Sequence, residues 1–290
     1  MEEDRLSDRK IWITGASGRI GTELVKALKA DMGNKIVATD LDVDITDLEE
    51  VNSHIDIYRP NIVINCAAIP RSQYCEEHMV ETFKVNALGA RNLAIASRRL
   101  NAKIIHISTD DVFDGKTAGM LTEFDVPLPV SVYGKSKLAG ENYVKELNPK
   151  HLIVRSSWVY GSGIDRDFFT QVVRHGQEGT SFDVTVDQVS SPTCIDDLVN
   201  FLLALMDKTE YGIYHASSEG ACTRLGFASA VLEQMGYDPS LARGVFANGA
   251  TQTSTLLENL MMKMTGVYEM PQWQDGLRKH VEIIRGRSDS

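Results

Sequence analysis

Short apolar runs alternate with segments of helical period along the first half of the chain. Apolar, β-branched runs predict buried strands at residues 11–14, 35–39, 61–67, 103–108 and 152–156. Apolar residues at helical spacing predict helices at residues 22–30 and 80–99. This alternation predicts an α/β fold: a Rossmann-type, doubly wound parallel sheet whose strands present ligands at their carboxyl ends.

The second half is more helical, and a single domain rarely extends over 290 residues. Helices are predicted at residues 167–176, 198–206, 225–235, 256–264 and 273–284, and strands at 184–188 and 212–216. We therefore expect a dinucleotide-binding domain over residues 1–160, to which residues 184–216 return. Residues 161–183 and 217–290 are expected to form a smaller C-terminal α/β substrate lobe.

Composition excludes several classes of partner. A formal net charge of −10 argues against nucleic acid and anionic membrane surfaces, which need an extended basic face. The N-terminus is charged, and no apolar stretch approaches the roughly twenty residues of a membrane span, so a cytoplasmic protein is expected. The four cysteines form no CxxC pair and have no neighbouring histidine cluster, which predicts neither a metal site nor a disulfide framework: Cys66, Cys75, Cys194 and Cys222.

A glycine-rich loop, GASGRIG, follows the first strand and precedes the first helix. In a dinucleotide fingerprint, Gly15 would permit the tight turn and Gly18 would let the backbone approach a pyrophosphate. Gly21 would allow close packing, and the helix N-terminus would offer N–H groups to the phosphates. The string alone also fits an ordinary glycine-rich turn, but its position between strand and helix favours the binding function.

Asp40 ends the second strand, about twenty residues beyond the loop, where a carboxylate accepts from the adenosine ribose hydroxyls. A carboxylate there repels a 2′-phosphate, which favours NADH over NADPH. Arg19 argues in the other direction because it could reach that phosphate. The alternative for Asp40 is a turn or helix-capping aspartate in an acidic stretch.

The candidate catalytic residues are Thr109, Tyr133 and Lys137. Tyrosine and lysine four positions apart share a helix face, so an ammonium can lie near the phenol and favour its ionised form. Such a tyrosine can transfer a proton to a carbonyl oxygen, to which the Thr109 hydroxyl could also donate a hydrogen bond. The YxxxK pattern alone is common on exposed helices; the glycine loop and the Ser108-Thr109-Asp110 strand end give it weight.

With these motifs the chain resembles the extended short-chain dehydrogenases/reductases and, among them, the dTDP-4-dehydrorhamnose reductases, over nearly its whole length. The resemblance rests on GASGRIG, VDITD (43–47), RPNIVINCAA (59–68), VNALGARNLA (85–94), HISTDDVFDG (106–115), YGKSKLAGE (133–141), RSSWVYG (155–161), DQVSSPTCIDDL (187–198) and GIYHASSEG (212–220). It implies an NADH- or NADPH-dependent enzyme that reduces a 4-keto group on a nucleotide-linked deoxysugar, and a homodimer.

The resemblance also assigns residues to the site. The catalytic residues would be Thr109, Tyr133 and Lys137, with Tyr133 as proton donor and Lys137 also holding the nicotinamide ribose. The sugar would lie against Asp110, Val112, Phe113 and Trp158. Cofactor contacts would come from Gly15, Ser17, Gly18, Arg19, Ile20, Gly21, Asp40, Asp44, Ile45, Cys66, Ala67, Ala68, Asn86, Tyr133 and Lys137.

Two departures from the family pattern leave the identity of the sugar open. The family usually reads STDYVFDG, and Asp111 stands here in place of the tyrosine. It also usually carries an Arg-Pro a few residues before a Ser-x-Leu in its last third, which the stretch Ala250–Leu256 lacks. An absent arginine removes a phosphate clamp, for which Arg243 and Asn248 are candidate replacements.

Two other functions stay open. A nucleotide-sugar epimerase or dehydratase uses the same tyrosine and lysine but keeps NAD bound and returns the hydride. The stretch 40–61 looks too short for the complete extra βα unit of such enzymes. The regulatory subunit of methionine adenosyltransferase resembles the same family and needs no catalysis, but the presence of Thr109, Tyr133 and Lys137 favours an enzyme.

Overall fold

The computed structural model describes residues 9–31, 33–70, 72–117, 119–163, 167–247 and 253–288. They form two compact units. The first contains the chain up to Asp114 and the segments Val126–Arg155 and Leu202–Tyr214; the second contains Gly115–Asp125, Ser156–Phe201 and the chain from His215 onward.

The first unit is built around a six-stranded parallel sheet, which confirms the predicted Rossmann-type fold. Its order is β11-β6-β4-β3-β1-β2, with β1 Arg9–Thr14, β2 Asn34–Thr39, β3 Ile62–Asn65, β4 Lys103–Thr109, β6 His151–Ser156 and β11 Gly212–His215. Strands β2 and β3 lie on opposite sides of β1, so the order in which strands are added to the sheet reverses between β1 and β3. Ligands of open α/β sheets bind at such a reversal.

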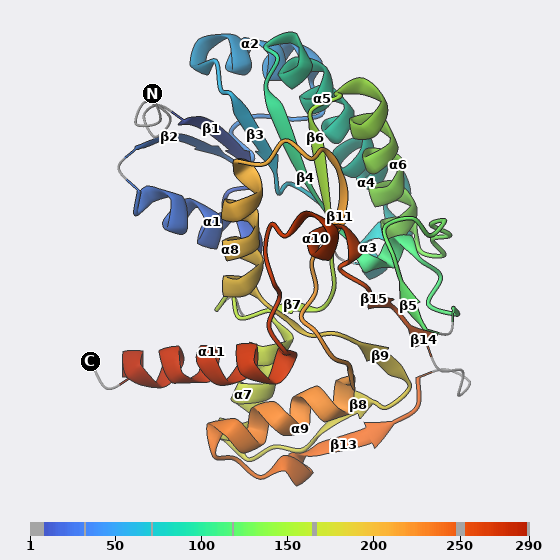
Figure 1. Cartoon of the computed structure of the whole chain (residues 1–290). Coiled ribbons are helices and arrows are strands. Elements are labelled where there is room, and N and C mark those ends of the chain that lie inside the picture. The colour runs from blue at the N-terminus through green and yellow to red at the C-terminus, as the bar shows by residue number, and fades with distance from the viewer. Residues whose placement is uncertain are drawn as a thin grey trace. The chain divides into compact units, whose positions relative to one another are not determined.

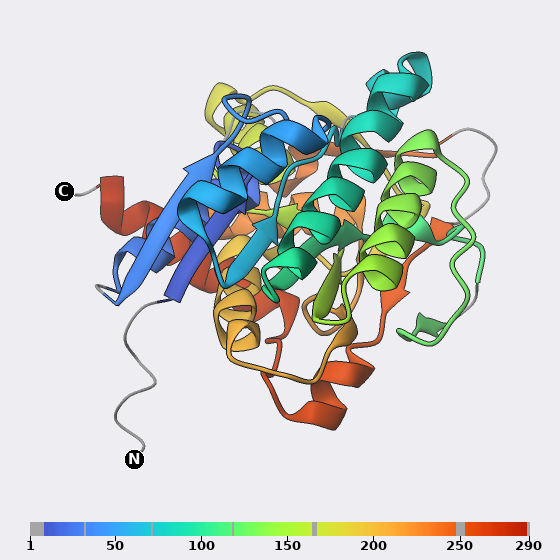
Figure 2. The ribbon, with the colours of Figure 1, turned by 90° about the horizontal axis from the view of Figure 1, so that it is seen from above.

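Helices pack on the sheet through apolar faces. The helices of the unit are α1 Arg19–Lys29, α2 Leu48–Tyr58, α3 Ser72–Glu77, α4 Met79–Phe83, α5 Ala90–Arg99 and α6 Val132–Leu147. Figure 2 shows α2, α5 and α6 side by side, and their buried residues Val51, Leu93 and Val144 belong to one core cluster with Trp12 and Ile104 of the sheet. This packing holds the first residues of α6, including Tyr133, near the end of β4.

The long helix predicted at residues 80–99 exists, but it is not uniform. Between α4 and α5, residues Lys84–Gly89 form a π-helical segment, η2. A π-helical turn widens the helix locally and is frequent at functional sites. Here it contains Asn86, one of the predicted cofactor residues.

The second unit (Figure 1) contains short strands and helices. Its strands are β5 Met120–Leu121, β7 Val159–Tyr160, β8 Phe182–Thr185, β9 Gln188–Ser190, β10 Thr193–Cys194, β12 Cys222–Thr223, β13 Ala242–Val245, β14 Thr253–Ser254 and β15 Leu256–Leu257. Its helices are α7 Phe168–Glu178, α9 Arg224–Met235, α10 Leu260–Thr265 and α11 Trp273–Ser288, and α8 Ile195–Met206 crosses the boundary between the units.

Pairing explains which segments belong to this unit. Strand β5 pairs with β15, β8 pairs with β13, and β9 pairs with β12 and β14, so residues 115–125 and 182–190 join the C-terminal part. The sequence placed residues 115–125 and 184–201 with the first domain instead. The helix predicted at 256–264 was wrong at its start, because Leu256–Leu257 pair with β5 and α10 begins at Leu260.

Membrane insertion finds no support in the helices. Among the described residues, no helix combines the length and the apolar character that a bilayer span requires.

Candidate active site

The glycine loop lies against the segment that follows β3. Gly15 has φ 66°, and a Cβ placed there would lie 2.5 Å from the amide nitrogen of Ala67. A Cβ at Gly21 would collide with the carbonyl oxygen of Gly15. Two of the predicted glycine functions, the tight turn and the close packing, are therefore visible as geometry.

The N-terminus of α1 is open to solvent. Gly18 is its N-cap residue and has no side chain to accept from the N–H groups of the first turn. Ser17, Gly18 and Arg19 are exposed, while Gly21 is buried. Bare N–H groups and the positive end of a helix dipole suit a pyrophosphate, so these residues fit a dinucleotide.

Asp40 follows β2 and is already tied to the loop. Its Oδ2 accepts hydrogen bonds from the backbone N–H of Ser17, at 2.9 Å, and from the Ser17 hydroxyl. The carboxylate remains half-buried. Carboxylate oxygens accept several hydrogen bonds, so an adenosine ribose hydroxyl could also donate to Asp40.

The other predicted cofactor residues have distinct roles in the fold. Cys66, Ala67 and Ala68 are half-buried behind the loop. Asn86 is buried and holds that segment, because its Oδ1 accepts from the N–H of Ile69 at 2.8 Å and its Nδ2 donates to the Ile69 carbonyl at 3.2 Å.

Two further predicted residues lie after β2. Ile45 is 6% exposed and packs in the core, so its side chain supports the fold. Asp44 is exposed and its carboxylate accepts from the N–H of Thr46 at 2.8 Å. Ile20, in the first turn of α1, is half-buried.

Tyr133 and Thr109 meet where α6 begins and β4 ends. Tyr133 is half-buried in the first turn of α6, and its hydroxyl lies close enough to the Thr109 side chain for the two to interact. Burial raises the pKa of Tyr133 above its ordinary value, and the Asp111 and Asp110 carboxylates raise it further, whereas Thr109 and Arg19 oppose them. The phenol therefore stays protonated, as a proton donor must.

Asp111 is the exposed group of this segment. Its backbone N–H donates to Thr109 Oγ1 at 3.2 Å, and Thr109 Oγ1 donates to Asp111 Oδ2 at 3.4 Å. A carboxylate here replaces the phenol that the resemblance predicts. The substitution thus changes the charge beside the proposed proton donor.

Lys137 lies at one end of a row of buried polar side chains that contact one another. Thr14 Oγ1 donates to Asn65 Oδ1 at 2.9 Å, and Asn65 Nδ2 lies 3.0 Å from His106 Nδ1. His106 Nε2 lies 3.5 Å from Lys137 Nζ, which donates to the Ile107 carbonyl at 2.6 Å. All four polar side chains of this row are buried.

Hydrogen positions in this row follow from one backbone group. The N–H of Ala67 donates to Asn65 Oδ1 at 3.1 Å, which fixes the amide orientation. Asn65 Nδ2 must then donate to His106 Nδ1, so the neutral ring carries its proton on Nε2, facing Lys137. Burial lowers the pKa of Lys137 to about 8, against Glu141 and Cys66, which raise it.

A buried ion pair lies next to the end of β4. Glu141 and Arg155 are each 2% exposed; Arg155 Nη2 donates to Glu141 Oε2 at 2.7 Å and Nε donates to Oε1 at 3.0 Å. Ser108 Oγ donates to the same carboxylate at 2.5 Å, and the Arg155 guanidinium lies 5.2 Å from the Phe113 ring centroid. The pair joins α6, β4 and β6.

The predicted sugar residues belong to both units of the chain. Val112 and Phe113 are buried, and Asp110 is 7% exposed. Trp158 belongs to the second unit, where the Arg224 guanidinium lies 3.8 Å from its ring centroid. Trp158 has φ 42°, a conformation rare for an aromatic residue and often found at functional sites.

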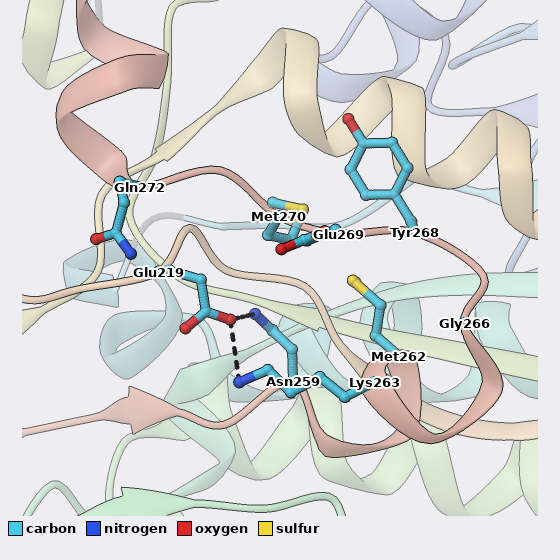
Figure 3. Close-up of a pocket in the computed structure, with 9 residues that line it drawn as sticks. All are labelled: Glu219, Asn259, Met262, Lys263, Gly266, Tyr268, Glu269, Met270 and Gln272. Atoms are coloured by element: carbon cyan, nitrogen blue, oxygen red, sulfur yellow. Dashed lines mark hydrogen bonds and ion pairs between the residues drawn. The ribbon is translucent and has the colours of Figure 1, made fainter.

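A pocket of about 730 Å³ lies in the second unit (Figure 3). Lys263 projects beside it, but its Nζ already lies 2.7 Å from Glu258 and 3.3 Å from Glu219. The hydrogen bonds that Lys263 donates to Glu258 and Glu219 raise its pKa. The cation is thus neutralised locally and makes a poor phosphate clamp.

The two candidate replacements for the missing arginine differ. Arg243 pairs with Asp183 at 3.0 Å on the surface of the second unit. Asn248 and residues 250–252 lie outside the described residues.

Sequence patterns missed two buried features. The first is the pair Asn65 and His106, two polar residues at strand positions that are otherwise apolar. The second is the pair Glu141 and Arg155, which lie inside motifs of the resemblance but were assigned no role. A polar residue inside an apolar run was the available signal.

The fold and this chemistry define the class: a nicotinamide-dependent oxidoreductase of the short-chain dehydrogenase/reductase type. The chain matches the family model described as RmlD substrate binding domain over residues 9–285. It therefore belongs to the RmlD family and is an oxidoreductase like the dTDP-4-dehydrorhamnose reductases.

Named relatives cover most of the chain. It is 31% identical to the spore coat polysaccharide biosynthesis protein SpsK of Bacillus subtilis, covering 94% of this chain and 97% of that one. It is 35% identical to the dTDP-4-dehydrorhamnose reductase of Aggregatibacter actinomycetemcomitans, covering 82% of each. It is also 35% identical to the dTDP-4-keto-6-deoxy-D-glucose reductase of Streptomyces niveus, covering 96% and 98%.

Solved structures agree. A dTDP-4-dehydrorhamnose reductase from Clostridium acetobutylicum superposes with a TM-score of 0.90 at 36% identity, covering 95% of this chain and 99% of that one. The Bacillus anthracis enzyme of the same name, in complex with NADP, gives 0.89 at 34% identity and covers 94% and 98%.

Proposed function

We propose that this chain reduces the 4-keto group of dTDP-4-dehydro-L-rhamnose, or of a close analogue, with NADH or NADPH, in the synthesis of cell-surface polysaccharide precursors. One observation carries the proposal: Tyr133 at the start of α6 lies next to Thr109 at the end of β4, with buried Lys137 one turn further along α6. The relatives named as reductases of two different dTDP-keto-sugars support the substrate class.

In the proposed mechanism, a bound reduced nicotinamide supplies hydride to the carbonyl carbon. Thr109 donates a hydrogen bond to the keto oxygen, and Tyr133 transfers its proton to that oxygen as negative charge develops. Lys137 binds the nicotinamide ribose. The tyrosinate then recovers a proton from solvent.

The loop residues would hold the dinucleotide. The N-terminus of α1 would bind the pyrophosphate and Asp40 would accept from the adenosine ribose. Cys66 and Ala67, beside Gly15, would lie under the nicotinamide half.

Two alternatives remain testable. An epimerase or dehydratase would be isolated with cofactor bound stoichiometrically, and a regulatory subunit would show no turnover at all. Helix α2 fills the stretch between β2 and β3, and no strand is present there among the described residues. That absence of an added βα unit favours the reductase.

The test is oxidation of NADH and of NADPH with dTDP-4-dehydro-L-rhamnose, followed by absorbance of the reduced nicotinamide. We expect sugar-dependent turnover and formation of dTDP-L-rhamnose. dTDP-4-keto-6-deoxy-D-glucose serves as the second substrate, and turnover with it alone would correct the sugar. No turnover with either would overturn the proposal. Light scattering on the same preparation tests the predicted homodimer.

The pH dependence of turnover should report the ionisation of Lys137. The groups that face Lys137 Nζ are His106 from β4, Glu141 from α6 and Cys66 from the segment after β3. A pKa lowered to about 8 keeps the ammonium charged below that pH and neutral above it. Turnover should therefore be full below about pH 8 and decline above it. Tyr133, whose pKa is raised, should not titrate in this range.

A Lys137→Arg variant is the matched comparison, because a guanidinium stays charged at every working pH. Its turnover should be lower but independent of pH between about 7 and 10. Persistence of the same decline in that variant would assign the ionisation to another group.

Cofactor preference should depend on Asp40. In Asp40→Asn the repulsion of a 2′-phosphate is removed and one charged acceptor for the ribose is lost. We expect kcat/KM for NADH to fall roughly tenfold and that for NADPH to rise, measured with the same keto-sugar. Ser17→Ala removes only the hydroxyl that donates a hydrogen bond to Asp40, so it should leave the preference between NADH and NADPH unchanged. An unchanged preference in Asp40→Asn would place ribose recognition elsewhere.

A further inference from the structure

Three side chains of metal-ligating type meet in the second unit: Cys194 and its near neighbour Asp196, and His280, which is distant from both in sequence. Cys194 Sγ, Asp196 and His280 each place a ligand atom within 4.8 Å of the others. Asp196 Oδ2 lies 3.5 Å from His280 Nδ1 and 3.9 Å from Cys194 Sγ. These separations approach those of ligands around one tetrahedral ion, which are about 3.2–3.8 Å for bonds of 2.0–2.3 Å.

A buried carboxylate oxygen at the same place lacks a partner. Asp197 is 7% exposed, and its Oδ2 makes no hydrogen bond to the described residues. His280 is also 7% exposed, and its Nδ1 faces the Asp196 carboxylate at ion-pair distance without a hydrogen bond of good geometry. An unpaired polar atom in a protein interior is costly, so Asp197 Oδ2 points to a missing ligand.

Gly276 of α11 lets Asp197 and Cys194 approach the helix backbone. A Cβ placed at Gly276 would lie 3.0 Å from Asp197 Oδ2, 3.3 Å from Cys194 Cβ and 3.5 Å from the Tyr160 hydroxyl oxygen. His280 lies edge-on to Tyr160, with ring centroids 5.9 Å apart. The absence of a side chain at Gly276 thus leaves Cys194, Asp197 and Tyr160 facing the first turn of α11.

Apolar packing holds the three ligands in position. Cys194 ends β10, Asp196 lies in the first turn of α8, and His280 lies in the middle of α11. Trp273, Leu277 and Val281 of α11 pack in one buried cluster with Cys194. The imidazole is therefore presented from the same face of α11 that packs in this cluster.

We propose that Cys194, Asp196 and His280 bind a divalent transition metal of the zinc class in the second unit. Cys194 binds as thiolate through Sγ, His280 through Nδ1 and Asp196 through one carboxylate oxygen. On binding, the Cys194 thiol releases its proton to solvent, and the metal changes no oxidation state. Water, or Asp197 Oδ2 after a small movement, completes four-coordination.

The site is independent of the proposed reduction. It joins β10 and α8 to α11, so the bound ion would cross-link these elements within the second unit. The sequence predicted no metal because Cys194 and His280 do not share a short motif. The signal appears only when α11 is packed against β10.

The test uses tag-free protein with Co²⁺ and Zn²⁺ as the probes. We expect one Co²⁺ per chain with a thiolate-to-cobalt charge-transfer band, and a rise in the melting temperature with Zn²⁺ that competes Co²⁺ away. Cys194→Ser should lose the charge-transfer band, and His280→Gln should bind Zn²⁺ at least tenfold more weakly by calorimetry. Cys222→Ser, a half-buried cysteine of the same unit, should keep both signals.

Circular dichroism of each variant without metal shows that the fold is retained. Absence of stoichiometric Co²⁺ binding by the wild-type chain would overturn the proposal. Equal binding by Cys194→Ser, or loss of the band in Cys222→Ser, would overturn it as well. Because no readout is catalytic, failure here is distinguishable from failure of the proposed reductase activity.

Discussion

Tyr133→Phe should lower kcat for reduction of the keto-sugar by about 10²- to 10⁴-fold, the usual loss of a general acid. Phenylalanine keeps the aromatic ring in the first turn of α6 and removes only the hydroxyl, which lies near Thr109. Cofactor affinity should fall much less than turnover, because Tyr133 is only one of many proposed cofactor contacts. The measurement is single-turnover oxidation of the preferred cofactor beside fluorescence titration of its binding.

Tyr143→Phe supplies the control, since Tyr143 is also half-buried on α6. That variant should turn over as the wild-type chain does. If Tyr133→Phe reduced the sugar at more than about a tenth of the wild-type rate, Tyr133 would not be the proton donor. Loss of cofactor binding in Tyr133→Phe would show a structural effect instead.

The fold was predictable because its signals are local and repeated. Each strand of the first unit is a short apolar run, and the glycine loop lies between a strand and a helix at the expected point. Tyr133 and Lys137 share a face of α6 because residues four positions apart on any helix do so. These features follow from period and spacing alone.

The remaining features depend on contacts that spacing does not encode. The tautomer of His106 on β4 follows from the orientation of Asn65 on the neighbouring β3, which the Ala67 N–H fixes. The start of α10 was misjudged because Leu256 and Leu257 pair with β5, and tertiary pairing outweighs helical period in a short apolar stretch.

The sugar contacts stay predictions. Val112 and Phe113 were predicted to contact the sugar, and both side chains are buried, whereas the neighbouring Asp111 is exposed. Substrate choice is therefore expected to depend on Asp111 more than on its two apolar neighbours.

Glu141→Gln should destabilise the chain by about 3–5 kcal/mol, because it leaves the charge of Arg155 buried without a counter-charge. Glutamine keeps the shape of the side chain, so the loss is electrostatic. Urea unfolding followed by circular dichroism measures it. Glu146→Gln, on the exposed face of the same helix, should change the free energy of unfolding by less than about 0.5 kcal/mol.

A second readout separates stability from the site. Glu141 raises the pKa of Lys137, so removing its charge should lower that pKa and move the decline in turnover to lower pH. Joint replacement of Glu141 by leucine and Arg155 by methionine should recover most of the stability, because no buried charge is left unpaired. Its turnover should still decline at the lower pH, since the carboxylate near Lys137 remains absent. Stability and pH profile recovering together would mean that the pair acts only through the fold.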